Sequence, residues 1–533
     1  MASQNTAAQT ASVTRRTLVQ LGGAAAAAAT VAGLTAGRGL AYAAVDAAEA
    51  DASTPSFLIK PEPITDVAET YDFEVVVVGA GAAGMSAVLT AARGGAKVAC
   101  MQAEEAPLSQ GNMAACLDME RTSPAGRAAL ISKLIELSSH RANRSLLEAW
   151  ADNSAAALTQ FREAAAEGGI EVNEEEPDAD RHLVVNGYDV YLKANTYFGI
   201  GHWEVVKAIA PLAEAAGAEF FYSTPAVQLV VDEDGTVTGV VGQREDGSYV
   251  QLNASKGVVL ATGCYGCNKE MLAYYCPDLL EFPPFMIKKN GDGHKMGVWA
   301  GGEIEPIGHT KMVHDARVMR ADAPYLLVNY QGERCMAEGP LQGYLNNYVR
   351  DYIHQEGDAA AGNLYSVVDA KWQDQAAEWK EWNPEVNIRT CKVYYEGNTI
   401  AEACEAAAAD GYVLDAAAVE ATVARYNELA ELGADEDFGK DARYLRAVDE
   451  PPFAIIPHEM GYGLSAVLGG LLVNADNQVL KAGEHTPIEG LYAVGNCAGG
   501  FYGGIDYPMD VLGLSIGRAI TQGYLAGKLL AEL

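Results

Sequence analysis

Three glycines with the spacing Gly79-x-Gly81-x-x-Gly84 form the pattern that most clearly could do chemistry. In such a turn the first glycine permits a tight bend, the second lets backbone amides approach a pyrophosphate, and the third lets the next helix pack closely. The phosphates then lie at the positive N-terminus of that helix. The spacing therefore predicts a dinucleotide site whose contacts in this turn are Gly79, Ala80, Gly81, Ala82, Ala83 and Gly84.

Such a turn needs a strand before it and a helix behind it. Phe73–Val78 is a largely β-branched run, typical of a strand buried on both faces of a parallel sheet, and an Ala-rich stretch follows the turn. Ala96–Met101 is predicted as the next strand, which should end in an acid for the adenosine ribose. Gln102 stands there instead, and its amide can still hydrogen-bond a hydroxyl group.

Two further segments, Ala261–Gly263 and Leu491–Gly500, carry short glycine-containing motifs. With the glycine turn, and in the same order, they resemble the motifs of the flavoprotein family of soluble fumarate reductase and succinate dehydrogenase. The resemblance spans about residues 72–533. It implies an α/β fold in which a doubly wound, Rossmann-like FAD-binding domain is interrupted by an α+β capping domain, with substrate between them over the flavin. It also implies further FAD contacts at Gln102, Ser109, Gly111, Asn112, Val227, Thr262, Gly263, Gly495, Asn496, Leu512, Ser515 and Ile516.

The same resemblance sets the expected domain organisation. The segment Ser109–Asn112 resembles the stretch that passes beside the flavin, and it holds no histidine, so we expect FAD to be bound non-covalently. Residues 72–306 and 465–533 are the expected FAD-binding domain, and residues 307–464 are the expected cap. Residues 44–70 are rich in Ala, Asp, Glu and Pro, which predicts a solvated linker.

The first 43 residues are predicted to be an export signal. Arg15 and Arg16 precede an Ala-rich run from about residue 21 to 34, and Ala41–Ala43 forms a small-x-small cleavage pattern. The run is too short and too weakly apolar for a stable membrane span. We therefore expect a twin-arginine signal that is cleaved after Ala43, leaving no membrane span. The protein would act in the periplasm or at the outer face of the cytoplasmic membrane.

The segment Leu326–Glu338 resembles the family's LVNxxGxRFxxE hairpin. The resemblance implies that Arg334 is the proton donor of a reaction in which flavin N5 gives hydride to one carbon of an alkene. A positioned arginine flanked by carboxylates, here Glu333 and Glu338, can relay a proton and stabilise negative charge on the substrate.

The residues that match the family's substrate-binding residues depart from the family pattern. The family's substrate-binding arginine, in a stretch reading HGANRLGG, falls on Asp506, or on Asp510 with a small gap, and no arginine occurs between Gly499 and Arg518. An acid cannot clamp a carboxylate, so the sequence predicts a bulky, largely uncharged enone or unsaturated lactone. The cap histidine is His309 or His314, and either could instead be a surface histidine. The candidate substrate contacts are His309, His314, Tyr462, Tyr502, Asp506, Tyr507 and Asp510.

The charge balance restricts the partners. The chain has 37 Lys plus Arg against 71 Asp plus Glu, a net charge of −34. Residues 1–43 hold three arginines and no acid, so their removal leaves 34 basic and 71 acidic side chains, a net charge of −37. Such a field repels nucleic acid and anionic lipid surfaces, and it would attract a basic electron carrier such as a membrane-bound or exported cytochrome.

Nine cysteines remain, an odd number without paired disulfide spacing. Cys264, Cys267 and Cys276 could belong to an iron–sulfur or zinc site, but three thiolates do not complete a four-ligand site. We therefore expect no metal, with an iron–sulfur cluster as the alternative.

Taken together, these features predict an FAD-dependent oxidoreductase acting on CH–CH bonds, an exported ene-reductase of anaerobic respiration. Two alternatives stay open, which are a flavin dehydrogenase of the 3-ketosteroid type and a non-catalytic electron-transfer flavoprotein.

Overall fold

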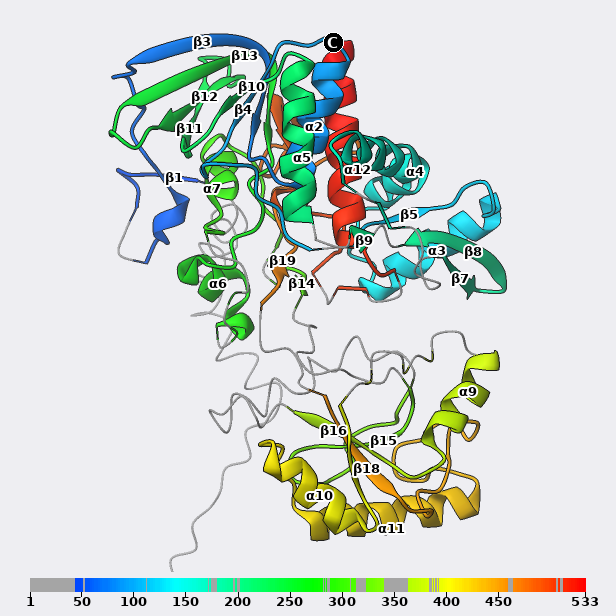
Figure 1. Ribbon diagram of the computed structural model, residues 1–533. Coiled ribbons are helices and arrows are strands. Elements are labelled where there is room, and N and C mark those ends of the chain that lie inside the picture. Colours follow the sequence, from blue (N-terminus) through cyan, green and yellow to red (C-terminus); the bar gives the residue numbers. More distant parts are fainter. Residues whose placement is uncertain are drawn as a thin grey trace, which may run out of the picture.

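A computed structural model describes residues 44–533 of the chain, apart from 51–52, 112, 171, 174–179, 195–196, 199–201, 281, 283, 285–287, 307, 313–322, 340–362, 383–385, 387, 389–390, 392, 459–463, 505–506 and 509–510. The described elements gather in two bodies, a larger one around a mixed sheet and a smaller one formed by β15–β18 and α9–α11 (Figure 1).

The larger body is built on an eight-stranded sheet. Its strands follow the order β10-β4-β3-β13-β12-β11, while β21 pairs with both β13 and β20. The strands β10, β4, β3, β13 and β21 run parallel to one another, and the pairs β13/β12, β12/β11 and β21/β20 are antiparallel. The bounds are β3 (Glu69–Val78), β4 (Val98–Met101), β10 (Glu219–Phe221), β11 (Ala226–Val231), β12 (Val237–Gln243), β13 (Tyr249–Leu260), β20 (Gln478–Leu480) and β21 (Pro487–Ala493).

The valines of β3 face two different cores. Val76 and Val78 belong to one buried apolar cluster, and Val75 and Val77 belong to another on the opposite face. Alternation between two apolar cores is what a continuous β-branched run in a parallel strand produces. The predicted α/β architecture is therefore confirmed, and β11, β12 and β13 form an antiparallel meander beside the parallel strands.

Four helices pack against one face of this sheet (Figure 1). They are α2 (Ala82–Arg93), α4 (Arg144–Glu167), α5 (His202–Ala215) and α12 (Leu514–Glu532). Small residues let α12 lie directly on α2, because a side chain at Gly523 would overlap the carbonyl of Ala83, and one at Gly527 would lie 2.5 Å from the carbonyl of Ala87. The last helix of the chain thus packs on the helix that follows the glycine turn.

Smaller elements surround this core. They are β1 (Val45–Asp46), η1 (Ser56–Leu58), β2 (Ile59–Lys60), β5 (Ala115–Leu117), α3 (Pro124–Leu137), β6 (Val172–Asn173), β7 (Asp180–Val185), β8 (Tyr188–Ala194), β9 (Tyr197–Phe198), α6 (Lys269–Tyr275), η2 (Pro277–Leu279), α7 (Asp292–Trp299), β14 (Lys311–Met312), β19 (Ala466–Val467) and η4 (Gly495–Cys497). Among them, β5, β8 and β7 form an antiparallel sheet, and the pairs β1/β2, β6/β9 and β14/β19 form two-stranded ones.

The linker predicted for residues 44–70 is wrong for its central part. Phe57 and Leu58 are 4% and 2% exposed and belong to the core of the larger body. The hydroxyl and amide of Ser56 bond the carboxylate of Glu270. The apolar run Phe57–Ile59 buries itself because an adjacent core accepts it, although the flanking composition is that of a linker.

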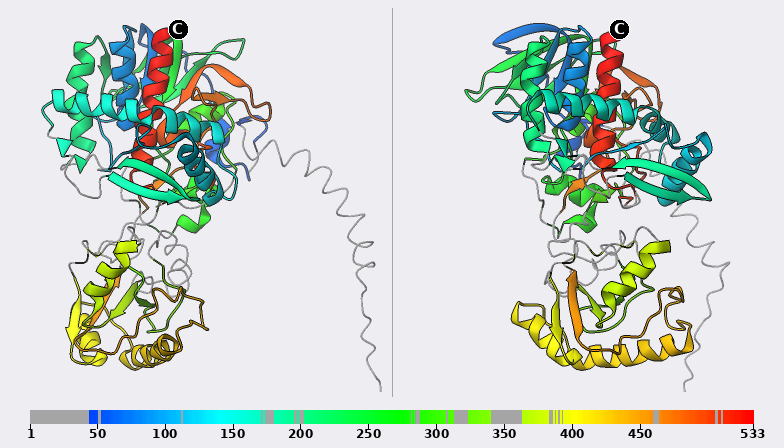
Figure 2. Two further views of the ribbon diagram at one scale, coloured as in Figure 1. Left: turned by 90° about the vertical axis from the view of Figure 1, so that its right-hand side faces the viewer. Right: turned by 45° about the vertical axis from the view of Figure 1, so that its right-hand side comes forward.

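In its described part, the smaller body is an antiparallel sheet covered by α9, α10 and α11 (Figure 2). Its strand order is β15-β16-β18-β17. Buried residues of α10 and α11 share one apolar cluster with Val367 and Ile455, whereas α9 shares another with Val368 and Ile456. The helices thus cover opposite faces of the sheet. The bounds are β15 (Leu326–Val328), β16 (Leu364–Val368), α9 (Trp372–Trp382), β17 (Tyr395–Gly397), α10 (Ile400–Ala409), α11 (Ala416–Leu432) and β18 (Phe453–His458).

Candidate active site

The glycine turn joins β3 directly to α2. Gly79 has φ +104°, and a Cβ atom there would lie 2.6 Å from the carbonyl oxygen of Ala261. A Cβ atom at Gly84 would overlap the carbonyl oxygen of Gly79. Gly81 is different, because a Cβ atom there would make an ordinary van der Waals contact, at 3.4 Å, with the carbonyl oxygen of Leu108. The first and third glycines are therefore required by packing, and the second is not.

This turn forms one wall of a cleft with about 1110 Å³ of empty space, part of it open to solvent. Most of the predicted cofactor residues line it, namely Gly79, Ala80, Gly81, Ala82, Ala83, Gln102, Ser109, Thr262, Gly263, Gly495, Asn496, Ser515 and Ile516. Gly84 lies behind the turn, and Gly111, Val227 and Leu512 are not part of the lining, whereas Asn112 lies outside the described residues. Sequence reasoning did not identify Leu108, Gln110, Pro225, Lys288, Lys289 and Asp292 as lining residues.

The side chain of Gln102 hydrogen-bonds the glycine turn. Its Oε1 accepts a hydrogen bond of 3.0 Å from the amide of Ala80, and its Nε2 donates to the carbonyl oxygen of Ala106 at 3.2 Å. The Gln102 side chain is only 7% exposed. It holds the glycine turn, whereas an acid at this position was expected to bond the adenosine ribose.

On the far side of the cleft, Arg518 of α12 organises the segment that follows β21. Its Nη1 donates to the carbonyl oxygens of Gly495 and Ala498 at 2.9 and 3.2 Å, and its Nη2 donates to Asn496 Oδ1 at 2.7 Å. The guanidinium is fully buried, and burial lowers the pKa of Arg518. No motif pointed to this arginine, since its partners precede it by about 20 residues and are mostly backbone atoms.

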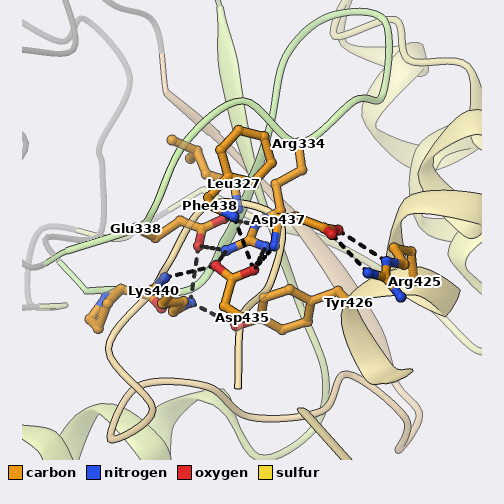
Figure 3. Close-up of polar contacts among 10 residues, drawn as sticks. Leu327, Arg334, Glu338, Arg425, Tyr426, Asp435, Asp437, Phe438 and Lys440 are labelled. Carbon is orange, nitrogen blue, oxygen red and sulfur yellow. Dashed lines mark hydrogen bonds and ion pairs between the residues drawn. The ribbon is translucent and has the colours of Figure 1, made fainter. Parts of the chain in front are cut away.

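The predicted catalytic arginine lies in the smaller body, in a buried ion cluster (Figure 3). Arg334 donates to Glu338 through Nε and Nη2 at 2.9 and 2.8 Å, and to Asp435 through Nη1 and Nη2 at 2.9 and 2.7 Å. The rings of Tyr426 and Phe438 lie 5.1 and 5.0 Å from the guanidinium. Four of its five N–H groups therefore bond two carboxylates.

Lys440 completes this cluster. Its Nζ lies 3.3 Å from Glu338 Oε2 and donates to the hydroxyl of Tyr426 at 2.7 Å and the carbonyl oxygen of Pro324 at 2.6 Å. Burial, helped by the charge of Arg334, lowers the pKa of Lys440 to about 8, although Glu338 opposes this shift. The side chains of Glu338, Asp435 and Lys440 are completely buried.

Within this cluster the proton of Arg334 is held tightly. Burial alone would lower the pKa of Arg334, but the bonds from Glu338 and Asp435 outweigh burial and raise it. Conversely, burial would raise the pKa of Asp435, and the bond from Arg334 leaves it well below its usual range. Glu333, the second predicted flanking carboxylate, is exposed, and Asp435 takes its place beside the guanidinium.

The predicted substrate residues of the larger body are buried. His309 has no exposed surface, its Nδ1 lies 2.6 Å from the hydroxyl of Tyr265, and its Nε2 lies 2.8 Å from the carbonyl oxygen of Glu305. Burial lowers the pKa of His309 to about 3, so the ring is neutral. Both ring nitrogens are thus paired inside an aromatic core, and a substrate contact at His309 stays a prediction.

Tyr507 and Tyr502 are 3% and 5% exposed. The hydroxyl of Tyr507 donates to the carbonyl oxygen of Val511 at 3.1 Å and accepts from the amide of Ser515 at 3.2 Å, so it fastens the loop to the start of α12. The ring of Tyr502 packs on the guanidinium of Arg518 at 5.1 Å. The remaining candidates, His314, Tyr462, Asp506 and Asp510, lie outside the described residues.

The side chain of Arg141 contacts the loop at Gly504, although the two residues are far apart in the sequence. A Cβ atom on Gly504 would lie 2.8 Å from both terminal nitrogens of Arg141, so the guanidinium rests directly on this glycine. The amide of Gly504 donates to Thr310 Oγ1 at 2.8 Å. Arg141 precedes the loop by more than 350 residues, which is why no local motif revealed it.

Comparison with known proteins agrees with this geometry. A family model described as an FAD binding domain matches residues 74–507. The chain belongs to this family of FAD-dependent, fumarate-reductase-like flavoproteins. As a member it is an FAD-dependent oxidoreductase acting on CH–CH bonds, and FAD is its cofactor.

Two similar proteins and one similar solved structure span most of this flavoprotein. The vinyl phenol reductase of Lactiplantibacillus plantarum is 26% identical, covering 87% of this chain and 98% of that protein. The digoxin reductase of Eggerthella lenta is 25% identical, covering 91% and 92%. The open conformation of a flavocytochrome c3 fumarate reductase has a TM-score of 0.62 and 23% identity, covering 87% and 79%.

The cleft of the flavoprotein fits FAD. Gly81 lines it, and the Oε1 atom of Gln110 is buried there without a hydrogen-bond partner among the described residues. A buried acceptor without a donor is costly, and a ligand N–H would satisfy it.

In the described part of this flavoprotein, free thiols occur at Cys100, Cys264, Cys276, Cys391, Cys404 and Cys497. Cys276 is buried, with its Sγ 3.7 Å from the hydroxyl of Tyr265, and burial raises its pKa to about 11. Within the described ranges, no three His, Cys, Asp or Glu side chains are grouped so that they could hold a metal ion, and this includes Cys264, Cys267 and Cys276. None of the helices in the described part of the chain is long and apolar enough to cross a membrane.

Proposed function

We propose that this flavoprotein is an exported reductase that saturates an activated C=C bond in a bulky, largely uncharged enone or unsaturated lactone. The buried aromatic cluster of Phe501, Tyr502 and Tyr507 makes the loop without the family arginine apolar, which supports an apolar substrate most directly. Ring centroids of Phe501 and Tyr502 are 4.8 Å apart, and those of Tyr502 and Tyr507 are 5.8 Å apart. Through Arg518 this cluster touches Asn496, which lines the cleft.

The reaction adds a hydride to one alkene carbon and a proton to the other. Bound FAD in its reduced form supplies the hydride, and two electrons and a proton restore that form, with a partner cytochrome as the proposed electron donor. The glycine turn and Gln102 orient the cofactor by fixing the backbone amides at the start of α2. FAD is bound non-covalently in this proposal, since no histidine occurs in residues 108–112.

Arg334 was expected to donate the proton, and its contacts favour another role. A guanidinium whose pKa is raised by two carboxylates gives up its proton less readily than a free one. We therefore assign Arg334, with Glu338, to holding the hairpin that begins at β15 against the segment after α11. The proton-donor role remains a prediction that the variants in the Discussion test.

A second substrate class is favoured by Arg141. The loop where the family arginine is missing still receives a guanidinium, which rests on Gly504. A guanidinium binds a carboxylate through two parallel hydrogen bonds. An unsaturated carboxylate such as an aryl acrylate is therefore the alternative to an uncharged substrate.

Both substrate classes can be tested by measuring how fast each alkene reoxidises the chemically reduced enzyme under anaerobic conditions. An aryl acrylate and its methyl ester form a matched pair, and a bulky enone and an unsaturated lactone are measured beside them. Faster reoxidation by the ester, enone or lactone supports the uncharged class. Faster reoxidation by the acid, lost selectively in Arg141→Ala, supports the carboxylate class. If no alkene reoxidises the flavin, the reductase proposal fails in favour of an electron-transfer flavoprotein. Reduction of the oxidised enzyme by a saturated 3-ketosteroid would instead indicate a dehydrogenase.

Export by the twin-arginine route is part of the proposal, and it rests on Arg15, Arg16 and the apolar run behind them. Replacing both arginines by lysine should retain the protein in the cytoplasm with FAD bound, as cell fractionation measures. Unchanged export of this double variant would contradict the route.

A further inference from the structure

Two adjacent lysines stand at the FAD cleft, and only one of them has an acidic partner. Lys288 Nζ lies 2.5 Å from Glu104 Oε2. Lys289 also lines the cleft, and none of the described carboxylates pairs with it. The nearby acid Asp292 is bound instead by Lys295, at 2.7 Å.

The ammonium of Lys289 is directed to the phosphate turn. A Cβ atom on Gly263 would lie 3.1 Å from Lys289 Nζ and 3.4 Å from its Cδ, so the side chain runs along this glycine. Gly263 follows Thr262, whose Cα would lie 3.2 Å from a Cβ atom on Gly79. Lys289 therefore points to the side of the cleft that contains the first glycine of the turn.

The backbone of Lys289 is held in place. Its carbonyl oxygen accepts a 2.8 Å hydrogen bond from the amide of Cys267, and Asn268 Nδ2 donates to the next carbonyl, of Asn290, at 3.1 Å. The Cys264–Cys267 turn, which the sequence raised as a metal candidate, thus supports the cleft wall. The Lys288–Glu104 ion pair fixes the preceding residue from the other side.

We propose that Lys289 is a positioning residue for the cofactor, whose ammonium pairs with the pyrophosphate of FAD. A pyrophosphate diester carries two negative charges, and this chain has a net charge of −34, so its overall field opposes binding of the cofactor. An ammonium without an acidic partner, placed beside the turn, provides a local attraction. It adds to the helix N-terminus of α2, which supplies only partial positive charge.

Release of FAD from the holoenzyme tests this assignment, with FAD fluorescence after dilution as the readout. Loss of a charge-assisted contact changes a dissociation constant about 10- to 100-fold, so Lys289→Ala should release FAD faster by about that factor. Lys289→Arg should stay within about 3-fold of the wild type because it keeps the charge, and the salt dependence of release should be weaker in Lys289→Ala.

Lys207→Ala is the matched control, since it removes an exposed lysine of α5 that pairs with Glu204 outside the cleft. It should change FAD release much less than Lys289→Ala does. Equal release from wild type and Lys289→Ala would overturn the assignment. A shifted flavin reduction potential with unchanged release would also overturn it, because the ammonium would then face the flavin ring. If Lys289→Arg released FAD as fast as Lys289→Ala, the faster release would come from a folding defect and not from the lost charge.

Discussion

Glu338→Ala is expected to destabilise the smaller body by about 3–5 kcal/mol, the cost of breaking a buried ion pair by removing one partner. The variant would leave Arg334 and Lys440 buried with Asp435 as their only carboxylate, and it would also remove the acceptor for the amide of Leu327 at 3.1 Å. Denaturant unfolding of the full chain, followed by tryptophan fluorescence, to which Trp372, Trp379 and Trp382 of α9 contribute, measures this loss.

Glu333→Ala is the matched control, because Glu333 belongs to the same hairpin and is exposed. A surface substitution of this kind should stay within about 0.5 kcal/mol of the wild type. Equal stability of the two variants would contradict the structural role of the cluster.

Variants of Arg334 can distinguish a role in holding the hairpin from a role as proton donor. If it holds the hairpin, Arg334→Lys should lower stability and turnover together. Arg350, the next arginine along the chain, lies outside the described residues and is the comparison variant. Loss of turnover in a fully stable Arg334→Lys, with normal turnover in Arg350→Ala, would restore the proton-donor assignment.

The second large effect is expected at the glycine turn. Gly84→Ala should abolish FAD binding, because its Cβ atom would overlap the carbonyl oxygen of Gly79 and move α2 away from the turn. The purified variant should lack the flavin absorbance, and its melting temperature should fall as well. Gly84→Ala with a normal flavin content would disprove this packing requirement.

Gly81→Ala distinguishes packing from ligand approach. Its Cβ atom finds no atom closer than 3.4 Å, and its φ of −82° suits any residue. The FAD content of Gly81→Ala should therefore fall while the stability of the flavin-free protein stays near that of the wild type. An equal loss of stability in both variants would show that Gly81 also has a packing role.

The cofactor half of the site could be predicted because its signals are local. A β-branched strand, three spaced glycines and a small-residue helix follow one another within about 20 residues, and each dictates its own geometry. The contributions of Arg518 and Lys289 could not be predicted, since they depend on tertiary contacts with Asn496 and Gly263 rather than on a neighbouring motif.

The substrate half was harder to predict for a physical reason. The family resemblance suggested His309 as a substrate contact and Glu333 as a carboxylate beside Arg334. In the structure, both ring nitrogens of His309 are paired among aromatic rings, and Glu333 is exposed. Asp435, which pairs with Arg334, is 101 residues further along the chain. Only the folded smaller body brings these two side chains together.

The position of α12 affects the order in which this protein matures. Arg518 and Ser515 of this helix complete the cofactor cleft, whereas the glycine turn is more than 400 residues earlier in the chain. During synthesis the strands β3 and β4 and the entire smaller body leave the ribosome before α12 does. The cleft can close around FAD only afterwards, so acquisition of the cofactor is a late step that follows release of nearly the whole chain.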